Sequence, residues 1–235
     1  MEKRLDSALQ NSITGHAKCV VIGLNWTYVE GPVGAGIVHT PARGTEGCRS
    51  LPEPGNYQGR ALADIARLTA SKNIFERVLG FAAINANHNR FDLKGASVNG
   101  LDIIHPRSEH TVIIGRFPRL DKRLPGAAVI ERNPYPGEYP MEAAADLLPA
   151  ADFIAITAST VSNGTLSKIL TLTPKTAFTV LVGPSAPLSP VLFDLGIDAL
   201  SGLVPHDLNA TAQCIAEGGT VSALKAFGRY VTIFR

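Results

Sequence analysis

A regular alternation of short apolar runs and helical stretches begins at Thr111 and constrains this chain more than any other feature. Each run ends in Gly, Pro or small polar residues, a pattern typical of βαβ units. The runs are apolar throughout, as expected when helices cover both faces of a mostly parallel sheet. The sequence predicts strands over 111–114, 127–130, 153–157, 177–182, 199–203 and 230–234, with helices at about 118–123, 141–148, 163–170, 187–195 and 207–217. We therefore expect a Rossmann-like domain over residues 106–235.

The part of the chain before this alternation follows a different pattern. Residues 18–29 and 34–39 are expected to form two strands joined by the turn-rich segment 30–33, which predicts a β-hairpin. A Gly- and Pro-rich segment over 41–57 is interpreted as a long loop, and two helices are expected at about 59–68 and 74–87. The fold class is thus α/β, with an α+β lobe over residues 1–105 before the mostly parallel sheet.

Composition excludes several classes of protein. Apolar residues make up 45% and charged residues 18%, so the chain can bury a large core. The net charge of +2, with no basic cluster, argues against nucleic-acid binding. No apolar run approaches the roughly 18 residues that span a bilayer, and no signal-peptide core is present at the N-terminus. We expect a cytoplasmic protein with no membrane partner.

Cysteine and histidine spacing gives no local metal motif. Cys19, Cys48 and Cys214 are far apart, so reduced thiols are expected rather than a disulfide framework or a thiolate zinc site. The six histidines show neither H-x-x-x-H nor H-x-H spacing. Any metal site would have to be assembled across domains.

The carboxyl ends of parallel strands form the usual binding crevice of such a sheet, and polar residues follow several of the predicted strands. Gly115, Arg116 and Phe117 stand after the first strand, where the segment lacks the glycines of a dinucleotide-binding loop. NAD is therefore not expected as a cofactor. Glu131 ends the second strand, where a carboxylate can bind a ribose diol or simply face solvent.

Two further loops offer hydroxyl and amide groups. Thr157, Ser159, Asn163 and Thr165 precede and enter a helix, where they suit an oxygen-rich or anionic ligand. The alternative is a polar loop in which Asn163 is an ordinary helix N-cap. The next strand is followed by Pro184 and Ser185, in a rigid turn, and the fifth by His206 and then Asp207, an expected N-cap.

Asn85 is unusual because it lies among core residues of the second predicted helix. At 100° per residue it shares one stripe with Ile74, Val78 and Phe81. A buried amide must have partners, so Asn85 either holds loop backbone or faces a ligand in the cleft. We expect it to face the loops that carry Glu131 and Ser185.

Several segments together resemble the "Putative heavy-metal chelation" family. They are residues 21–27 (VIGLNWT), 76–86 (ERVLGFAAINA), 115–118 (GRFP), 136–140 (PGEYP), 163–166 (NGTL) and 183–187 (GPSAP). The resemblance covers nearly the whole chain. It implies an enolase-N-terminal-like domain followed by a Rossmann-like domain, with the active site in the cleft between them.

Three functions are compatible with these residues. The first is binding or processing of a small metal chelate or metal-chelating metabolite in the interdomain cleft, since oxygen and amide groups suit a metal that is already chelated. The second is a lyase or transferase acting on an adenosyl or phosphorylated substrate, and the third is a sensor or scaffold. Whether the protein is an enzyme stays open, as does a homodimer. The expected partner is a small molecule, and the cofactor is unassigned, with a metal or metal chelate as one alternative.

Overall fold

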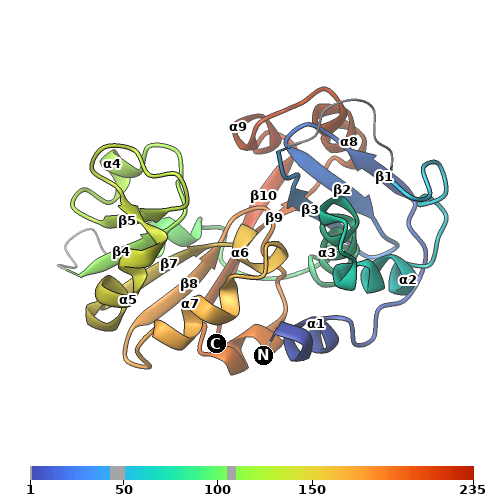
Figure 1. Cartoon of the computed structure of the whole chain (residues 1–235). Coiled ribbons are helices and arrows are strands. Elements are labelled where there is room, and N and C mark those ends of the chain that lie inside the picture. Colours follow the sequence, from blue (N-terminus) through green and yellow to red (C-terminus); the bar gives the residue numbers. More distant parts are fainter. Residues whose placement is uncertain (1, 43–50, 105–109) are drawn as a thin grey trace.

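The computed structural model describes residues 2–42, 51–104 and 110–235, which form two sheets flanked by helices (Figure 1). The strands are β1 (Cys19–Ile22), β2 (Trp26–Glu30), β3 (Ala35–His39), β4 (Thr111–Ile114), β5 (Ala128–Glu131), β6 (Tyr139–Pro140), β7 (Phe153–Thr157), β8 (Phe178–Val182), β9 (Ala199–Pro205) and β10 (Gly228–Phe234). The α-helices are α1 (Glu2–Leu9), α2 (Leu62–Ala66), α3 (Ile74–His88), α4 (Leu120–Arg123), α5 (Ala144–Leu147), α6 (Ser159–Ser162), α7 (Leu166–Leu172), α8 (Leu208–Ala216) and α9 (Val221–Leu224). Short 3-10 helices are η1 (Arg67–Ala70), η2 (Gly100–Ile103), η3 (Met141–Ala143), η4 (Leu148–Ala150) and η5 (Pro190–Leu195).

The larger sheet has seven strands in the order β10-β9-β8-β7-β4-β5-β6. All neighbours are parallel except β10, which pairs antiparallel with β9. The chain runs from β4 outward through β5 to β6, and then returns to the other side of β4 as β7. Strand order therefore reverses between β4 and β7, which is where open α/β sheets bind ligands. The predicted α/β fold class, with its mostly parallel sheet, is confirmed.

The smaller sheet has three antiparallel strands: β2 and β3 form the expected hairpin, but the prediction of one continuous strand over 18–29 is wrong, because this segment forms both β1 and β2. The expected strand over 18–29 is interrupted at Gly23, whose N–H closes a turn by donating to the carbonyl of Trp26 at 2.9 Å. Asn25 ties this turn to the end of α8 by donating from Nδ2 to the carbonyl of Gly218 at 2.8 Å. A side chain at Gly23 would lie 2.2 Å from the carbonyl oxygen of Ile215, so glycine permits the close approach.

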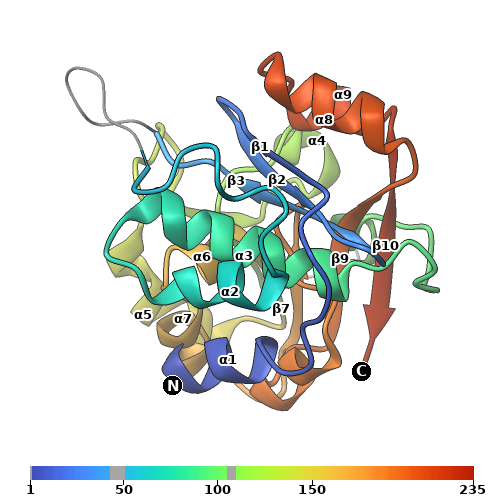
Figure 2. The ribbon, with the colours of Figure 1, turned by 90° about the vertical axis from the view of Figure 1, so that its right-hand side faces the viewer.

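Helices cover both faces of the smaller sheet. Alternate strand residues point to opposite faces, and Tyr28 and Ile37 join a buried cluster that includes Ile215 of α8, whereas their neighbours Val29 and Val38 pack with α3. Figure 2 shows the strands of this sheet between α8 and α3. Because α8 follows β9, the C-terminal part of the chain completes the N-terminal lobe.

One continuous hydrophobic core joins the two lobes. Residues from α1, α3 and β3 belong to the same buried cluster as residues from β4, β7 and β8. The segment just before residue 105 packs on the larger sheet, since the N–H of Gly100 donates to Oγ of Ser201 at 2.8 Å. The expected domain division after residue 105 stays a prediction, and residues 105–109 lie outside the described part of the chain.

Several expected helices are shorter than their sequence patterns indicate. The stretch 141–148 forms η3, α5 and the start of η4, and 187–195 contains only η5. The helix expected at 118–123 is limited to α4, because Arg119 adopts a left-handed backbone conformation with φ 57°. In contrast, α3 begins as expected, with Oδ1 of Asn73 accepting the N–H of Phe75 at 3.0 Å. Within the described residues, no helix has the length and apolar character needed to cross a bilayer.

Candidate functional site

A cavity of about 750 Å³ lies between the end of the smaller sheet and the carboxyl ends of β4, β5, β7 and β8. All but two of the site residues predicted from the sequence line it. These lining residues are Gly115, Arg116, Phe117, Glu131, Thr157, Ser159, Asn163, Thr165, Pro184 and Ser185. Asn85 and His206 do not line it. The topology thus gathers loops that follow four different strands.

Gly115 brings the β4 loop close to the end of β7. It has φ 96°, and a Cβ atom at this position would lie 2.5 Å from Cγ2 of Thr157. Its N–H donates to the carbonyl of Ile130 on β5 at 2.9 Å. Glycine is therefore required both for the left-handed conformation and for the contact with Thr157.

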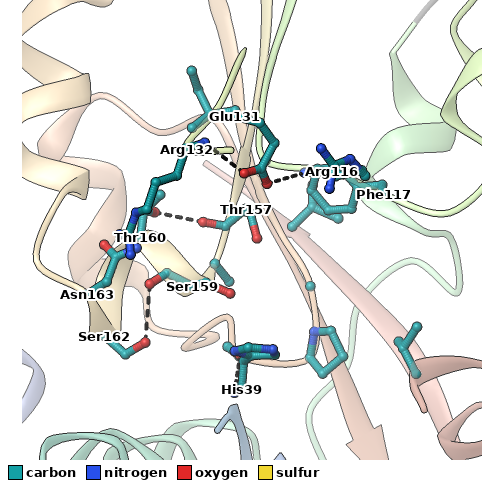
Figure 3. Close-up of a pocket in the computed structure, with 18 of the residues that line it drawn as sticks. His39, Arg116, Phe117, Glu131, Arg132, Thr157, Ser159, Thr160, Ser162 and Asn163 are labelled. Carbon is teal, nitrogen blue, oxygen red and sulfur yellow. Dashed lines mark hydrogen bonds between the residues drawn. The ribbon is translucent and has the colours of Figure 1, made fainter. Parts of the chain in front are cut away.

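Glu131 sits at the end of β5 with its carboxylate held by backbone. Oε1 accepts the N–H of Arg116 at 3.1 Å, and Oε2 accepts the N–H of Arg132 at 2.8 Å (Figure 3). Each carboxylate oxygen has further acceptor capacity. The side chain is consequently fixed in place while it can still accept a hydrogen bond from a ligand hydroxyl or amine.

The loop after β7 supplies hydroxyl groups. Figure 3 shows the side chains of Thr157 and Ser159 pointing into the space between Glu131 and His39. Asn163 does not act as the N-cap of α7: its Oδ1 accepts the N–H of Thr165 at 3.0 Å and the Thr165 hydroxyl at 2.7 Å, and α7 begins at Leu166. The amide therefore shapes the loop between α6 and α7.

Two buried asparagines, Asn85 of α3 and Asn89 directly after this helix, hold the loop that follows β8. Nδ2 of Asn85 donates to the carbonyl of Ser185 at 2.9 Å, and Nδ2 of Asn89 donates to the carbonyl of Ala186 at 3.0 Å. The Ser185 hydroxyl in turn accepts the backbone N–H of His39 at 3.0 Å. Asn85 lies behind the loop rather than in the cavity, so its observed contact is the backbone of the loop that carries Pro184 and Ser185.

His39 at the end of β3 lines the cavity and was not singled out from the sequence. Its ring meets the Trp26 ring edge to face, with centroids 5.7 Å apart. Desolvation in this position lowers the pKa of His39, so the imidazole is neutral at neutral pH. No local motif marks this residue, since its partners in the cavity come from β7 and β8.

Basic side chains from dispersed segments also converge on the cavity. They are Arg77, Arg116, Arg123, Arg132 and Lys225. Among the described lining residues, Glu131 is the one carboxylate. The lining therefore carries net positive charge and favours an anionic ligand. Only Arg116 of this set was a candidate from sequence, because the others are separated along the chain and form no motif.

Arg116 is fixed at the rim by the loop that precedes β6. Its guanidinium binds Glu138 through two hydrogen bonds, at 2.9 and 2.6 Å, and lies 3.6 Å from the centroid of the Tyr135 ring. Hydrogen bonds from Arg116 lower the pKa of Glu138 to about 2. The same pairing raises the pKa of Arg116. The loop over 132–138 is thereby fastened to the β4 loop.

The depressed pKa of Glu138 gives a pH-dependent prediction. A carboxyl group whose pKa is lower in the folded protein stabilises the fold above its unfolded pKa of about 4.3, and this contribution is lost as pH falls toward 2. We expect wild type to have a higher thermal midpoint than Glu138→Gln at neutral pH, and this difference to decrease below about pH 4. Calorimetry across this range checks it, and a difference that does not change with pH contradicts it.

The described residues do not form a site for a bare metal ion. They contain no group of three or more His, Cys, Asp or Glu side chains positioned to hold one. Burial raises the pKa of both Cys19 and Cys214, which disfavours the thiolate that a soft metal needs. Cys48 lies outside the described residues. Glu131 and His39 line the cleft but supply only one carboxylate and one imidazole.

The fold and the cleft define a two-lobed α/β protein. Its pocket has the size of a small-molecule site and lies where the strand order of the larger sheet reverses. The chain belongs to the family described as "Putative heavy-metal chelation": the DUF364 profile matches residues 99–234 and the DUF4213 profile, with the same description, matches residues 6–87. The family resemblance expected from the sequence is confirmed.

Two solved structures are similar to the whole chain. A DUF364-family protein of unknown function from Desulfitobacterium hafniense DCB-2 is 27% identical with a TM-score of 0.86, and the match covers 99% of this chain and 98% of that one. A DUF364-family protein of unknown function from Pyrococcus horikoshii is 23% identical with a TM-score of 0.80, covering 100% of this chain and 98% of that one. No functionally curated protein matches the sequence.

Proposed function

We propose that this protein binds a small anionic metal chelate, or a metal-chelating metabolite, in the cleft between its lobes. The observation that carries the proposal is the chemistry of the lining. Thr157 and Ser159, which carry hydroxyl groups, line the same cavity as basic side chains, and the described residues offer no cluster for a bare ion. Such groups can bind the organic part of a chelate, whereas stripping a soft ion would require thiolates or several imidazoles.

Charge supports an anionic ligand. The lining cations Arg77 and Arg132 form no ion pair within the described part of the chain, although Arg77 donates to the carbonyl of Ser162 at 3.0 Å. Chelators built on carboxylates or phosphates keep negative charge after binding a divalent ion, and guanidinium groups recognise such oxygens. The family description supports the link to metal.

Calorimetric titration tests the proposal with defined probes. The protein is titrated with Ni²⁺ alone, with citrate and nitrilotriacetate alone, and with the two preformed nickel complexes. We expect at least one complex to bind about tenfold more tightly than Ni²⁺ alone, equivalent to about 1.4 kcal/mol. Binding of Ni²⁺ alone as tightly as either complex would contradict the proposal, as would the absence of binding by both complexes.

A hydroxyl deletion locates the binding in the cleft. Thr157→Val keeps the methyl group beneath Gly115 and removes only the hydroxyl, so the complex should bind about two- to tenfold more weakly, as for one hydrogen bond of about 0.5–1.5 kcal/mol. The matched control is Thr171→Val, which removes an exposed hydroxyl from α7 outside the cavity. Equal affinities for the two variants would place binding elsewhere.

A second candidate is catalysis on an adenosyl or phosphorylated substrate, favoured by the position of Glu131. This carboxylate ends the second strand of a sheet whose order reverses at β4, where carboxylates of nucleotide-binding sheets bind ribose. An acid extract of the purified protein should then absorb in the ultraviolet as adenine does, and Glu131→Gln should remove that absorbance. Titratable nickel-complex binding with no retained adenine favours the first function.

A further inference from the structure

A second cavity, of about 510 Å³, opens beside the main cleft. Segments far apart in sequence line it: η2 and the residue before it, the β4–α4 loop with α4, and the α9–β10 segment. It shares residues with the main cleft, namely Asn99, Pro118, Arg123, Lys225 and Tyr230. The two cavities are therefore adjoining compartments, and one ligand can extend from the first into the second.

Basic groups dominate this second cavity. Arg119, Arg123 and Lys225 line it, against Asp102 as the one carboxylate among its described residues. Asp102 is already paired, because Arg123 binds its Oδ1 and also donates to Oδ1 of Asn99 at 3.1 Å. Arg119 and Lys225 have exposed side chains and no carboxylate partner within the described ranges. Two positive charges thus have no neutralising group among the residues that the structure describes.

Observed contacts position two of the three cations, Arg123 and Lys225. Arg123 is anchored by Asp102 and Asn99, and the ammonium of Lys225 lies 5.8 Å from the centroid of the Tyr230 ring. Tyr230 is half-buried and forms the wall shared by both cavities. The backbone of Arg119 at the start of α4 is left-handed, with φ 57° and ψ 34°.

We propose that the second cavity is an oxyanion subsite that takes a phosphate or carboxylate group of a ligand whose remainder occupies the main cleft. Guanidinium and ammonium groups that converge on one cavity recognise such groups through charge-assisted hydrogen bonds. The inference deepens the proposed function and rests on it for the remainder of the ligand. Recognition of the oxyanion itself depends only on Arg119, Arg123 and Lys225.

The test uses metal-free anions on the full chain. Inorganic pyrophosphate and citrate are titrated separately by calorimetry, which distinguishes a phosphate from a carboxylate subsite. We expect one or both to bind in the millimolar range or more tightly. Arg119→Gln and Lys225→Gln should each weaken that binding by about tenfold, as for loss of one charge-assisted hydrogen bond.

The matched control is Lys122→Gln. Lys122 is an exposed cation on the same helix as Arg123 but outside both cavities, so its replacement changes net charge equally and should leave the affinity unchanged. The subsite is refuted if neither anion binds, or if either cavity variant binds as tightly as Lys122→Gln. A failed nickel-complex titration leaves this result unaffected, because the probes contain no metal and Arg119 lines the second cavity but not the main cleft.

Discussion

Asn89→Ala should lower the free energy of unfolding by about 3 kcal/mol, because it leaves two buried backbone groups without partners at about 1–3 kcal/mol each. Asn89 is fully buried at the end of α3. Its Nδ2 donates to the carbonyl of Ala186 at 3.0 Å, and its Oδ1 accepts the N–H of Leu188 at 2.8 Å. Urea denaturation followed by circular dichroism measures the change.

Asn85 and Asn87 provide graded comparisons on the same helix. Asn85→Ala removes one hydrogen bond, to the carbonyl of Ser185, and also removes an Oδ1 atom that has no partner within the described residues. It should therefore cost less, about 1–2 kcal/mol. Asn87 is half-buried without a side-chain hydrogen bond in that same part of the chain, so Asn87→Ala should stay within about 0.5 kcal/mol of wild type. If Asn89→Ala lowers the free energy of unfolding no more than Asn87→Ala does, the hydrogen bonds from Asn89 to the loop after β8 do not stabilise the protein.

Gly36→Ala should also destabilise the fold by about 3 kcal/mol or more, the upper range for overpacking. Gly36 lies on β3, where a Cβ atom would stand 1.9 Å from the carbonyl oxygen of Ala82 and 2.8 Å from the backbone nitrogen of Ala86. The obstruction is helix backbone, which cannot move aside as a flexible side chain can. To make room for the added methyl group, α3 must move away from β3. The same strand ends in His39, which lines the cleft.

Gly196→Ala is the control for this prediction. Gly196 has φ 89° but open space around its Cα, so alanine meets only the left-handed backbone cost of about 1–2 kcal/mol. Chemical denaturation of both variants compares a steric clash with a purely conformational penalty. A smaller loss for Gly36→Ala than for Gly196→Ala would show that β3 and α3 are not in the close contact described.

The strands of the larger sheet were predictable because each is short, apolar and bounded by turn-forming residues. The strands 111–114 and 153–157 agree with β4 and β7 to the residue, and the loops after them line the cleft as the strand-end rule implies. The N-cap at Asp207 was also predictable, since its Oδ1 accepts the N–H of Ala210 at 3.0 Å. These features depend on local pattern and on parallel connectivity, both of which the residue order contains.

Other features depended on contacts between distant segments. The break at Gly23 is stabilised by Asn25 bonding to a residue 193 positions away, and Asn85 meets Ser185 at a separation of 100. Local periodicity placed Asn85 on the inward stripe of its helix but could not say whether loop backbone or a ligand would meet it. His39 and Lys225 likewise belong to no sequence motif, because the cavity that they line is formed by residues distant from them in the chain.

The sequence by itself determined the α/β class and the strand ends at which polar loops gather, because apolar periodicity and turn residues act over short distances; the family followed from the resemblance of several sequence segments. Only the tertiary structure decided that α8 covers the smaller sheet, that Asn85 and Asn89 form hydrogen bonds with the loop after β8, and that basic side chains converge on two adjoining cavities. The physical reason is that packing and charge convergence are set by which surfaces meet. Residues distant in the chain acquire these roles only when the two lobes share one core.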